Sequence, residues 1–254
     1  MDLNIAGKTA LVTGASKGIG LATAQSLARE GCNVHLAART EADLNAAAAA
    51  IRGECNVGVS VHVCDLSDGD AARALIDACS DVDFLVNNAG AIPGGDIHDV
   101  DEARLRDAWN LKVFGYQNTC RAMLAYMRGR GHGVIVNIIG AAGEKPTPGY
   151  VAGSAGNASI MAMTRALGAT SREYGVRVVG INPGAIITGR LETLARTFAE
   201  RDFGDAERWR DTLDKTYPPG QPEHIGDMVA FLVSDRSANT TGTIITIDGG
   251  SCAR

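Results

Sequence analysis

Residues 13–20, which read TGASKGIG, have the composition of a turn that binds phosphate. They follow a short apolar run and precede a helical pattern, which is the context that such a turn requires. Gly14 would allow the tight turn, Gly18 the approach of a pyrophosphate to the backbone, and Gly20 the packing of helix on strand. The free amides at the start of the helix would then face the anion. A loop that is merely rich in glycine is the alternative interpretation.

The residues after the second expected strand bear on which dinucleotide this turn would hold. In dinucleotide-binding folds an acidic side chain at this point binds the ribose 2′-hydroxyl, but here the strand ends at Ala38 and Arg39 follows. Arg39 and Lys17 could pair with a 2′-phosphate instead, because a guanidinium fork matches phosphate geometry. The sequence therefore favours NADP(H) over NAD(H), with two solvated surface charges as the alternative. Asp65, just past the third strand, is placed to meet the adenine amino group or else serves in a turn or helix cap.

Alternating apolar strands and helices must position these residues. Strands are expected at residues 9–12, 33–38, 57–64, 84–88, 133–139, 177–181 and 243–247. Besides the helix that opens at the glycine turn, helices are expected at residues 41–51, 68–79, 101–128, 154–174, 191–216 and 222–234. Seven near-continuous apolar strands between helices predict an α/β fold with a doubly wound parallel sheet of the Rossmann type. Residues 1–254 contain no evident linker or repeat, so they are expected to form a single dinucleotide-binding domain.

Composition argues against several other classes of protein. The chain of 254 residues is 45% hydrophobic and carries a net charge of −5, which disfavours nucleic acid or an anionic membrane as the main partner. No run approaches the roughly 18 apolar residues that a membrane span needs, and the first residues show no signal-peptide pattern. The six cysteines and five histidines are scattered without metal-ligand spacing. No metal site or disulfide framework is therefore expected, and a reducing cytoplasm is the expected compartment.

Motifs along nearly the whole chain resemble, in order and spacing, those of the classical short-chain dehydrogenases/reductases. They are residues 13–20, Asp65-Leu66, Asn87-Asn88-Ala89-Gly90, Asn110, Val136-Asn137-Ile138, Pro183-Gly184 and Asp248-Gly249-Gly250. The resemblance implies a nicotinamide-dependent oxidoreductase that acts on a small-molecule substrate. Its implied cofactor-binding residues are Gly14, Ser16, Lys17, Gly18, Ile19, Gly20, Arg39, Asp65, Leu66, Asn88, Ala89, Gly90, Pro183, Gly184, Ile186 and Thr188. The resemblance also implies that Asn110 holds a proton-relaying water and that residues 189–219 form a lid over the substrate.

The catalytic set of the resembled family is where this sequence departs. That set is a serine after the fifth strand and a Tyr-x-x-x-Lys segment at the start of the next helix. Matching from the strand and from the helix places Gly140 at the serine position, Gly153 at the tyrosine position and Asn157 at the lysine position. A glycine can neither transfer a proton nor orient a carbonyl. Another group must therefore handle the substrate oxygen if hydride is transferred.

Tyr150 is the candidate for proton transfer, because it is the only phenol in this segment. Without an adjacent cation its hydroxyl should keep a pKa of roughly 10, which suits base work at neutral pH poorly. A pocket-wall aromatic is the alternative. Asn157 could hydrogen-bond the cofactor ribose, while Glu144 and Lys145 are the nearest ionisable groups, with a solvated loop tip favoured for both. The catalytic candidates are Asn110, Tyr150 and Asn157.

The sequence leaves three functions open. The first is an NADP(H)-dependent oxidoreductase with a rearranged acid/base group, acting on a small carbonyl or alcohol. The second is a non-redox enzyme, a lyase or isomerase, because fold does not determine function. The third is a catalytically inactive nucleotide-binding subunit, which the intact glycine turn disfavours.

Assembly into a homodimer or homotetramer is also expected. In the resembled family the helices matching residues 101–128 and 154–174 pair across a two-fold axis. Apolar residues on these two helices are Leu105, Trp109, Phe114, Met123, Ile160, Met163 and Leu167.

Overall fold

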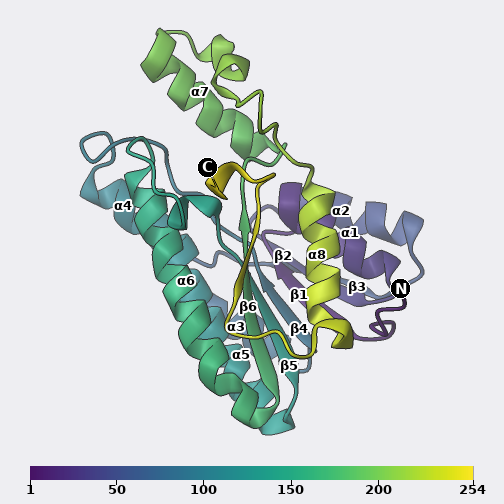
Figure 1. Cartoon of the computed structure of the whole chain (residues 1–254). Coiled ribbons are helices and arrows are strands. Elements are labelled where there is room, and N and C mark those ends of the chain that lie inside the picture. Colours follow the sequence, from purple (N-terminus) through teal and green to yellow (C-terminus); the bar gives the residue numbers. More distant parts are fainter. Residues whose placement is uncertain (254) are drawn as a thin grey trace.

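Seven parallel strands form one sheet in the order β3-β2-β1-β4-β5-β6-β7 in the computed structural model, which describes residues 1–253 (Figure 1). The strands are β1 (Thr9–Thr13), β2 (Asn33–Ala38), β3 (Val59–Val63), β4 (Phe84–Asn87), β5 (Gly133–Ile138), β6 (Val176–Pro183) and β7 (Ile244–Ile247). Every neighbouring pair is parallel. The order reverses at β1, with β2 on one side and β4 on the other. The predicted doubly wound sheet of the Rossmann type is thus confirmed.

Helices cover both faces of this sheet. They are α1 (Gly18–Arg29), α2 (Glu41–Glu54), α3 (Gly69–Ala78), α4 (Glu102–Trp109), α5 (Gly115–Arg130), α6 (Val151–Ser171), α7 (Gly189–Phe203) and α8 (Pro222–Val233). One core holds buried residues of α1, α2 and α8, such as Leu27, Leu44 and Leu232. Another core holds α3 and α5 residues such as Ile76 and Met123. Strands buried on both faces explain why they read as continuous apolar runs.

Two predicted helices are interrupted. The helix expected at residues 101–128 is split into α4 and α5 by a π-helical turn, Asn110–Phe114, and it runs on to Arg130. The polar helix expected at residues 191–216 is split into α7 and a 3-10 segment, Ala206–Thr212, by Gly204 in the left-handed region at φ 67°. A single inserted residue in a helix leaves no clear trace in a 3.6-residue period, so periodicity missed the π turn.

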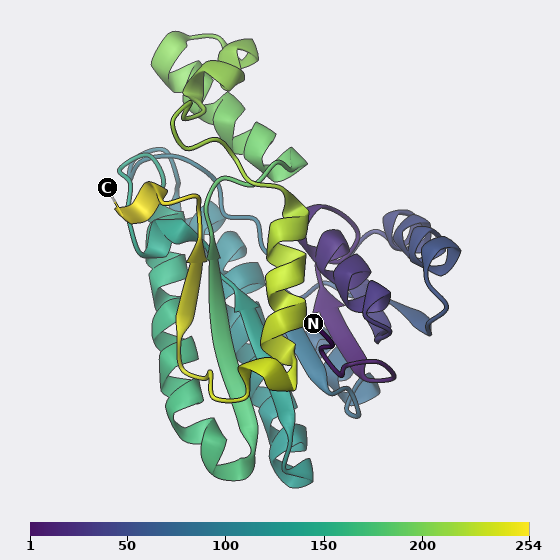
Figure 2. The ribbon, with the colours of Figure 1, turned by 45° about the vertical axis from the view of Figure 1, so that its right-hand side comes forward.

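The segment from α7 through the 3-10 turn projects beyond the carboxyl ends of the strands (Figures 1 and 2). This is the region that was expected to be a lid. Within residues 1–253 no helix has the length and apolarity to cross a membrane.

Of the apolar residues expected at a subunit interface, some are buried inside the chain and at least one is exposed. Met123 and Ile160 are buried within the chain's own cores. Phe114 remains 48% exposed.

Candidate active site and nucleotide site

The glycine turn between β1 and α1 has the shape that an anion requires. Gly14 and Gly18 have φ values of 64° and 58°, and a Cβ on Gly20 would lie 2.2 Å from the carbonyl oxygen of Gly14. Lys17 stands at the N-cap of α1, and its side chain makes no capping hydrogen bond. By contrast, the Asp68 side chain caps α3 and the Thr188 side chain caps α7. The first amides of α1 are therefore free to bind a phosphate group.

The glycine turn is locked against the segment that follows β4. The Thr13 hydroxyl accepts hydrogen bonds from the amides of Asn88 (2.9 Å) and Ala89 (3.1 Å). In return, the Asn88 side chain donates to the carbonyl oxygens of Thr13 (3.0 Å) and Gly14 (3.2 Å). Two motifs more than seventy residues apart in sequence thus form one rigid floor at the switch point of the sheet, where such folds bind ligands.

Lys17, Arg39 and Asp65 follow three neighbouring strands at one edge of the sheet. All three are exposed, and Ala38 and Val63 are paired across β2 and β3. Asp65 accepts hydrogen bonds from the amide (3.0 Å) and hydroxyl (2.8 Å) of Ser67. The amide hydrogen bond is the main cause that lowers the pKa of Asp65, and Arg39 adds a smaller attraction. Asp65 therefore forms a turn here, and one of its carboxylate oxygens takes part in neither bond.

The segment after β6 closes the opposite side of the cleft. Thr188 caps α7 through its hydroxyl, which accepts from the amide of Leu191 and donates to the carbonyl of Ile186, both at 3.2 Å. A Cβ on Gly18 would lie 3.2 Å from the Thr188 methyl group. The start of α7 therefore lies directly beside the glycine turn.

Gly140 and Gly153 are each covered by a neighbouring side chain. A Cβ on Gly153 would lie 2.0 Å from Cζ of Tyr150, so the phenol ring occupies the space of a side chain at 153. A Cβ on Gly140 would lie 2.8 Å from Nδ2 of Asn157, and Gly140 has a φ of 151°, which disfavours a side chain. The Tyr150 ring therefore fills the space beside Gly153, and the Asn157 amide fills the space beside Gly140.

Asn157 carries an unpaired acceptor. Its side chain is 2% exposed, and among residues 1–253 no group donates to its Oδ1. Buried polar atoms nearly always have a partner. A hydroxyl of a bound ligand would supply the missing donor.

Tyr150 is held in place from both sides. Its backbone pairs with Gly95, and its ring packs beside a cluster of Ile92, Ala108 and Ala152. Asn110 lies at the start of the π-helical turn and is exposed. The structure therefore brings Tyr150 beside Gly153 and Asn157 beside Gly140, and it leaves Asn110 open to solvent.

Lys112 is a charged residue of the site that sequence reasoning missed. Its Nζ donates to the carbonyl oxygen of Ile139 at 2.5 Å, directly before Gly140, and its stem packs against Gly90. Burial, with a smaller repulsion from Arg190, lowers the pKa of Lys112 to about 8. The position of Lys112, two residues after Asn110, is the only hint in the sequence that it belongs to the site. The π-helical turn changes the direction of its side chain, so helical periodicity does not predict it.

Glu144 and Lys145 are exposed, in keeping with the loop tip that the sequence favoured, but their side chains also make hydrogen bonds within the chain. Glu144 accepts from Asn182 Nδ2 (3.2 Å) and Thr246 Oγ1 (2.5 Å), and Lys145 donates to the carbonyl of Ser251 (3.1 Å). These bonds tie the loop to β6, β7 and the C-terminal segment. Their role is therefore to hold the loop.

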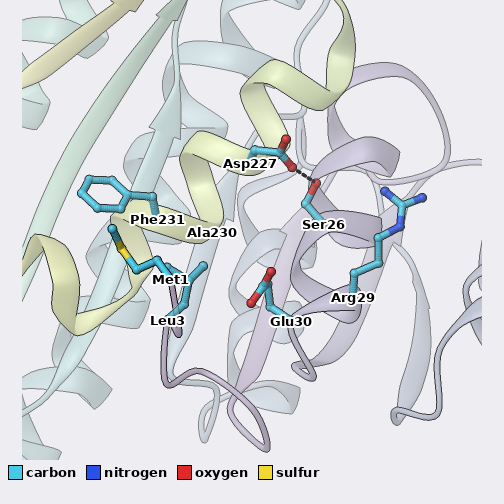
Figure 3. Close-up of a pocket in the computed structure, with 8 residues that line it drawn as sticks. All are labelled: Met1, Leu3, Ser26, Arg29, Glu30, Asp227, Ala230 and Phe231. Atoms are coloured by element: carbon cyan, nitrogen blue, oxygen red, sulfur yellow. Dashed lines mark hydrogen bonds between the residues drawn. The ribbon is translucent and has the colours of Figure 1, made fainter.

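Two cavities differ in their relation to this site. The larger, of about 540 Å³, lies between α7 and the 3-10 segment and includes Thr188, Leu191, Trp209 and Leu213 in its wall. The smaller, of about 240 Å³, lies between α1, α8 and the start of the chain, where Ser26 donates to Asp227 at 2.9 Å (Figure 3). The smaller cavity contains none of the predicted site residues, and the larger one adjoins them.

Comparison with known proteins agrees with this geometry. The family model described as short chain dehydrogenase matches residues 8–198. The 2-keto-3-deoxy-L-fuconate dehydrogenase of Xanthomonas campestris pv. campestris is 32% identical, over 98% of this chain and 81% of its own. The structure of L-sorbose reductase from Gluconobacter frateurii with NADPH and L-sorbose is 28% identical, with a TM-score of 0.90 over 100% of both chains. An NAD⁺-bound xylitol dehydrogenase is 29% identical, with a TM-score of 0.90 over 97% of this chain and 100% of the other.

Proposed function

The chain belongs to the short-chain dehydrogenase family, and on that premise we propose that it is an NADP(H)-dependent oxidoreductase with a non-standard acid/base group. Its substrate would be a small carbonyl compound or the corresponding alcohol. The observation that carries the proposal is the position of Tyr150, whose phenol ring lies over Gly153, where the family has its tyrosine. The non-redox and inactive alternatives have no comparable support.

The residues around the cleft fit a dinucleotide. The uncapped amides of α1 would hold the pyrophosphate, and the turn can take this shape because a Cβ on Gly14 or Gly20 would collide with the Asn88 side chain beneath it. Arg39 and Lys17 would pair with a 2′-phosphate, and Asp65 would meet the adenine amino group. Asn157 Oδ1 would accept a hydrogen bond from a ribose hydroxyl, which satisfies its orphaned acceptor. The bound nicotinamide supplies the hydride.

The chain's own residues would then manage the proton. In carbonyl reduction, the Tyr150 hydroxyl donates its proton to the substrate oxygen as the hydride reaches the carbonyl carbon. A water held by Asn110 returns a proton from solvent to the phenolate. The Nζ of Lys112 donates to the carbonyl oxygen of Ile139, the residue before Gly140, and would contribute positive charge at this strand end. Lys112 would then be a cation of the site in a chain that has Asn157 at the position of the family lysine.

The larger cavity supports the substrate class. Its wall is mainly apolar, with Leu191, Trp209, Leu213 and Pro219, and it carries one acidic and one basic residue, Glu192 and Arg210. Residues 189–219 would close over a substrate from this side. According to their names, the relatives described above act on keto and sugar compounds. A substrate with a polar carbonyl group, bound against the mainly apolar wall of this cavity, fits with those names.

NADPH absorbance measured over a panel of ketones, aldehydes and keto sugars tests the proposal. We expect substrate-dependent oxidation with at least one carbonyl compound. Tight NADPH binding without turnover over the whole panel would count against it.

A further inference from the structure

Three metal-ligand atoms converge outside the nucleotide site. Nδ1 of His35 lies 2.9 Å from Nε2 of His62, and Sγ of Cys79 lies 3.4 Å and 3.6 Å from these two nitrogens. His35 is in β2, His62 is in the adjacent strand β3, and Cys79 follows α3 directly. His62 lies opposite Ala37, two residues after His35, so both rings project from the same face of the sheet. Their distance in sequence explains why motif spacing did not reveal them.

The separations suit a tetrahedral ion. With Zn–S near 2.3 Å and Zn–N near 2.0–2.1 Å, ligand atoms are about 3.6 Å apart for sulfur and nitrogen and about 3.3 Å for two nitrogens. Both observed sulfur–nitrogen distances are close to that value. The nitrogen–nitrogen distance needs to widen by only a few tenths of an ångström, through rotation of the two partly exposed rings.

The donor set suits a soft or borderline ion. Two imidazoles and one thiolate are ligands that zinc prefers, whereas magnesium and calcium take oxygen. Imidazole has an ordinary pKa of roughly 6.5, so at neutral pH a ring is mostly neutral and keeps a lone pair for an ion. Cys79 is fully buried, and its thiol would give up its proton when an ion binds. The acidic side chain of Asp81 acts on both His35 and Cys79 and adds attraction for a cation.

We propose that His35, His62 and Cys79 form a zinc site with one position open to water or to Asp81. Binding forms two Zn–N bonds and one Zn–S bond. The Cys79 proton leaves to solvent. The proton that Nδ1 of His35 and Nε2 of His62 share in the free chain moves through solvent to the other nitrogen of its ring, so that both facing nitrogens can bind. The ion would cross-link β2, β3 and the end of α3. Arg39 and Asp65 follow those same strands by a few residues, so the cross-link would stiffen the side of the cleft where the adenosine part is expected.

Calorimetry and absorbance with the chelator-treated full chain test the site. We expect one Zn²⁺ per chain, about one proton released per ion, and a thiolate-to-metal charge-transfer band when Co²⁺ replaces Zn²⁺. Cys79→Ser and His62→Gln should each weaken Zn²⁺ binding by more than about 100-fold, beyond the cost of losing an outer-shell partner. Cys32→Ser is the matched control, because Cys32 is equally buried and lies outside the cluster.

Circular dichroism that is unchanged in the variants shows that the fold is kept and that only a metal ligand is lost. His62→Gln should disturb the fold least, because His62 lies on an edge strand. Retained Zn²⁺ affinity in Cys79→Ser and His62→Gln, or no stoichiometric binding by the parent chain at micromolar Zn²⁺, would overturn the proposal. The cluster would then be a hydrogen-bonded packing arrangement only.

Discussion

The phenol ring of Tyr150 lies across Gly153, so that a Cβ on the glycine would come within 2.0 Å of the ring's Cζ. The two residues therefore depend on each other: the ring can lie there only because position 153 has no side chain. The same relation holds between Asn157 and Gly140, where a Cβ would come within 2.8 Å of Nδ2. Restoring the family side chains at 140 and 153 would displace Tyr150 and Asn157 and would strain Gly140.

Gly153→Ala tests this dependence. The added methyl group should push the Tyr150 ring away and lower turnover by about 10² to 10⁴, the usual cost of losing a general acid, while NADPH affinity is retained. The double variant with Tyr150→Phe should lose no more than either single one, because both remove the same group. Gly129→Ala is the control, since a Cβ there meets nothing within 4 Å. Full additivity in steady-state kinetics would contradict the account.

Arg39 tests the preference for a 2′-phosphate. NADPH should bind more tightly than NADH, and Arg39→Ala should weaken NADPH by about 10- to 100-fold, as expected for a hydrogen-bonded charge pair. NADH affinity should change little, and Arg39→Asp should reverse the preference. Calorimetry with both nucleotides measures this, with the exposed Arg121→Ala as control. Equal affinity for the two nucleotides in the parent chain would refute the assignment.

Lys112 predicts a pH dependence of stability. Its pKa is lowered to about 8 in the folded chain, against roughly 10.4 when unfolded. Between these two pH values Lys112 binds more protons in the unfolded chain than in the folded one. The free energy of unfolding therefore increases as pH rises, by at most about 3 kcal/mol. Relative to Lys112→Met, the parent chain should become more stable from pH 8 to 10. Parallel curves in urea titrations would contradict the burial of this charge.

Arg177 should be a principal contributor to stability. It is 8% exposed, and its guanidinium donates to the carbonyl oxygens of Leu232 (2.8 Å) and Ser234 (3.0 Å) at the end of α8. Arg177→Met removes both of these charge-assisted hydrogen bonds and leaves the two carbonyl oxygens only the donors of Ser237, so it should lower the free energy of unfolding by about 2–4 kcal/mol. Arg177→Lys should recover little, because one ammonium group cannot span the acceptors. A loss below about 0.5 kcal/mol in denaturant titrations would show that water replaces the guanidinium.

The sheet and the glycine turn could be predicted from the sequence because their signals are local. Apolar runs mark strands buried on both faces, and Gly14 and Gly18 mark backbone that a side chain disfavours. Other features depend on contacts between distant residues. The ring of Tyr150 over Gly153, the ammonium of Lys112 on Ile139, and the convergence of His35, His62 and Cys79 arise only once helices and strands are packed. The π turn at Asn110 is a local feature, but it could not be predicted because it interrupts the 3.6-residue helical period.

Tyr150 is proposed to handle the substrate oxygen in hydride transfer. Single-turnover oxidation of bound NADPH by a carbonyl substrate, compared between the parent chain and Tyr150→Phe, tests it most directly. The variant keeps the ring, so it should bind NADPH with unchanged affinity and lose about 10² to 10⁴ in the rate of the chemical step. Tyr126→Phe, on an exposed tyrosine that donates to Asp77, should have the parent rate. An unchanged rate in Tyr150→Phe would contradict the account and leave Tyr150 as a wall of the pocket.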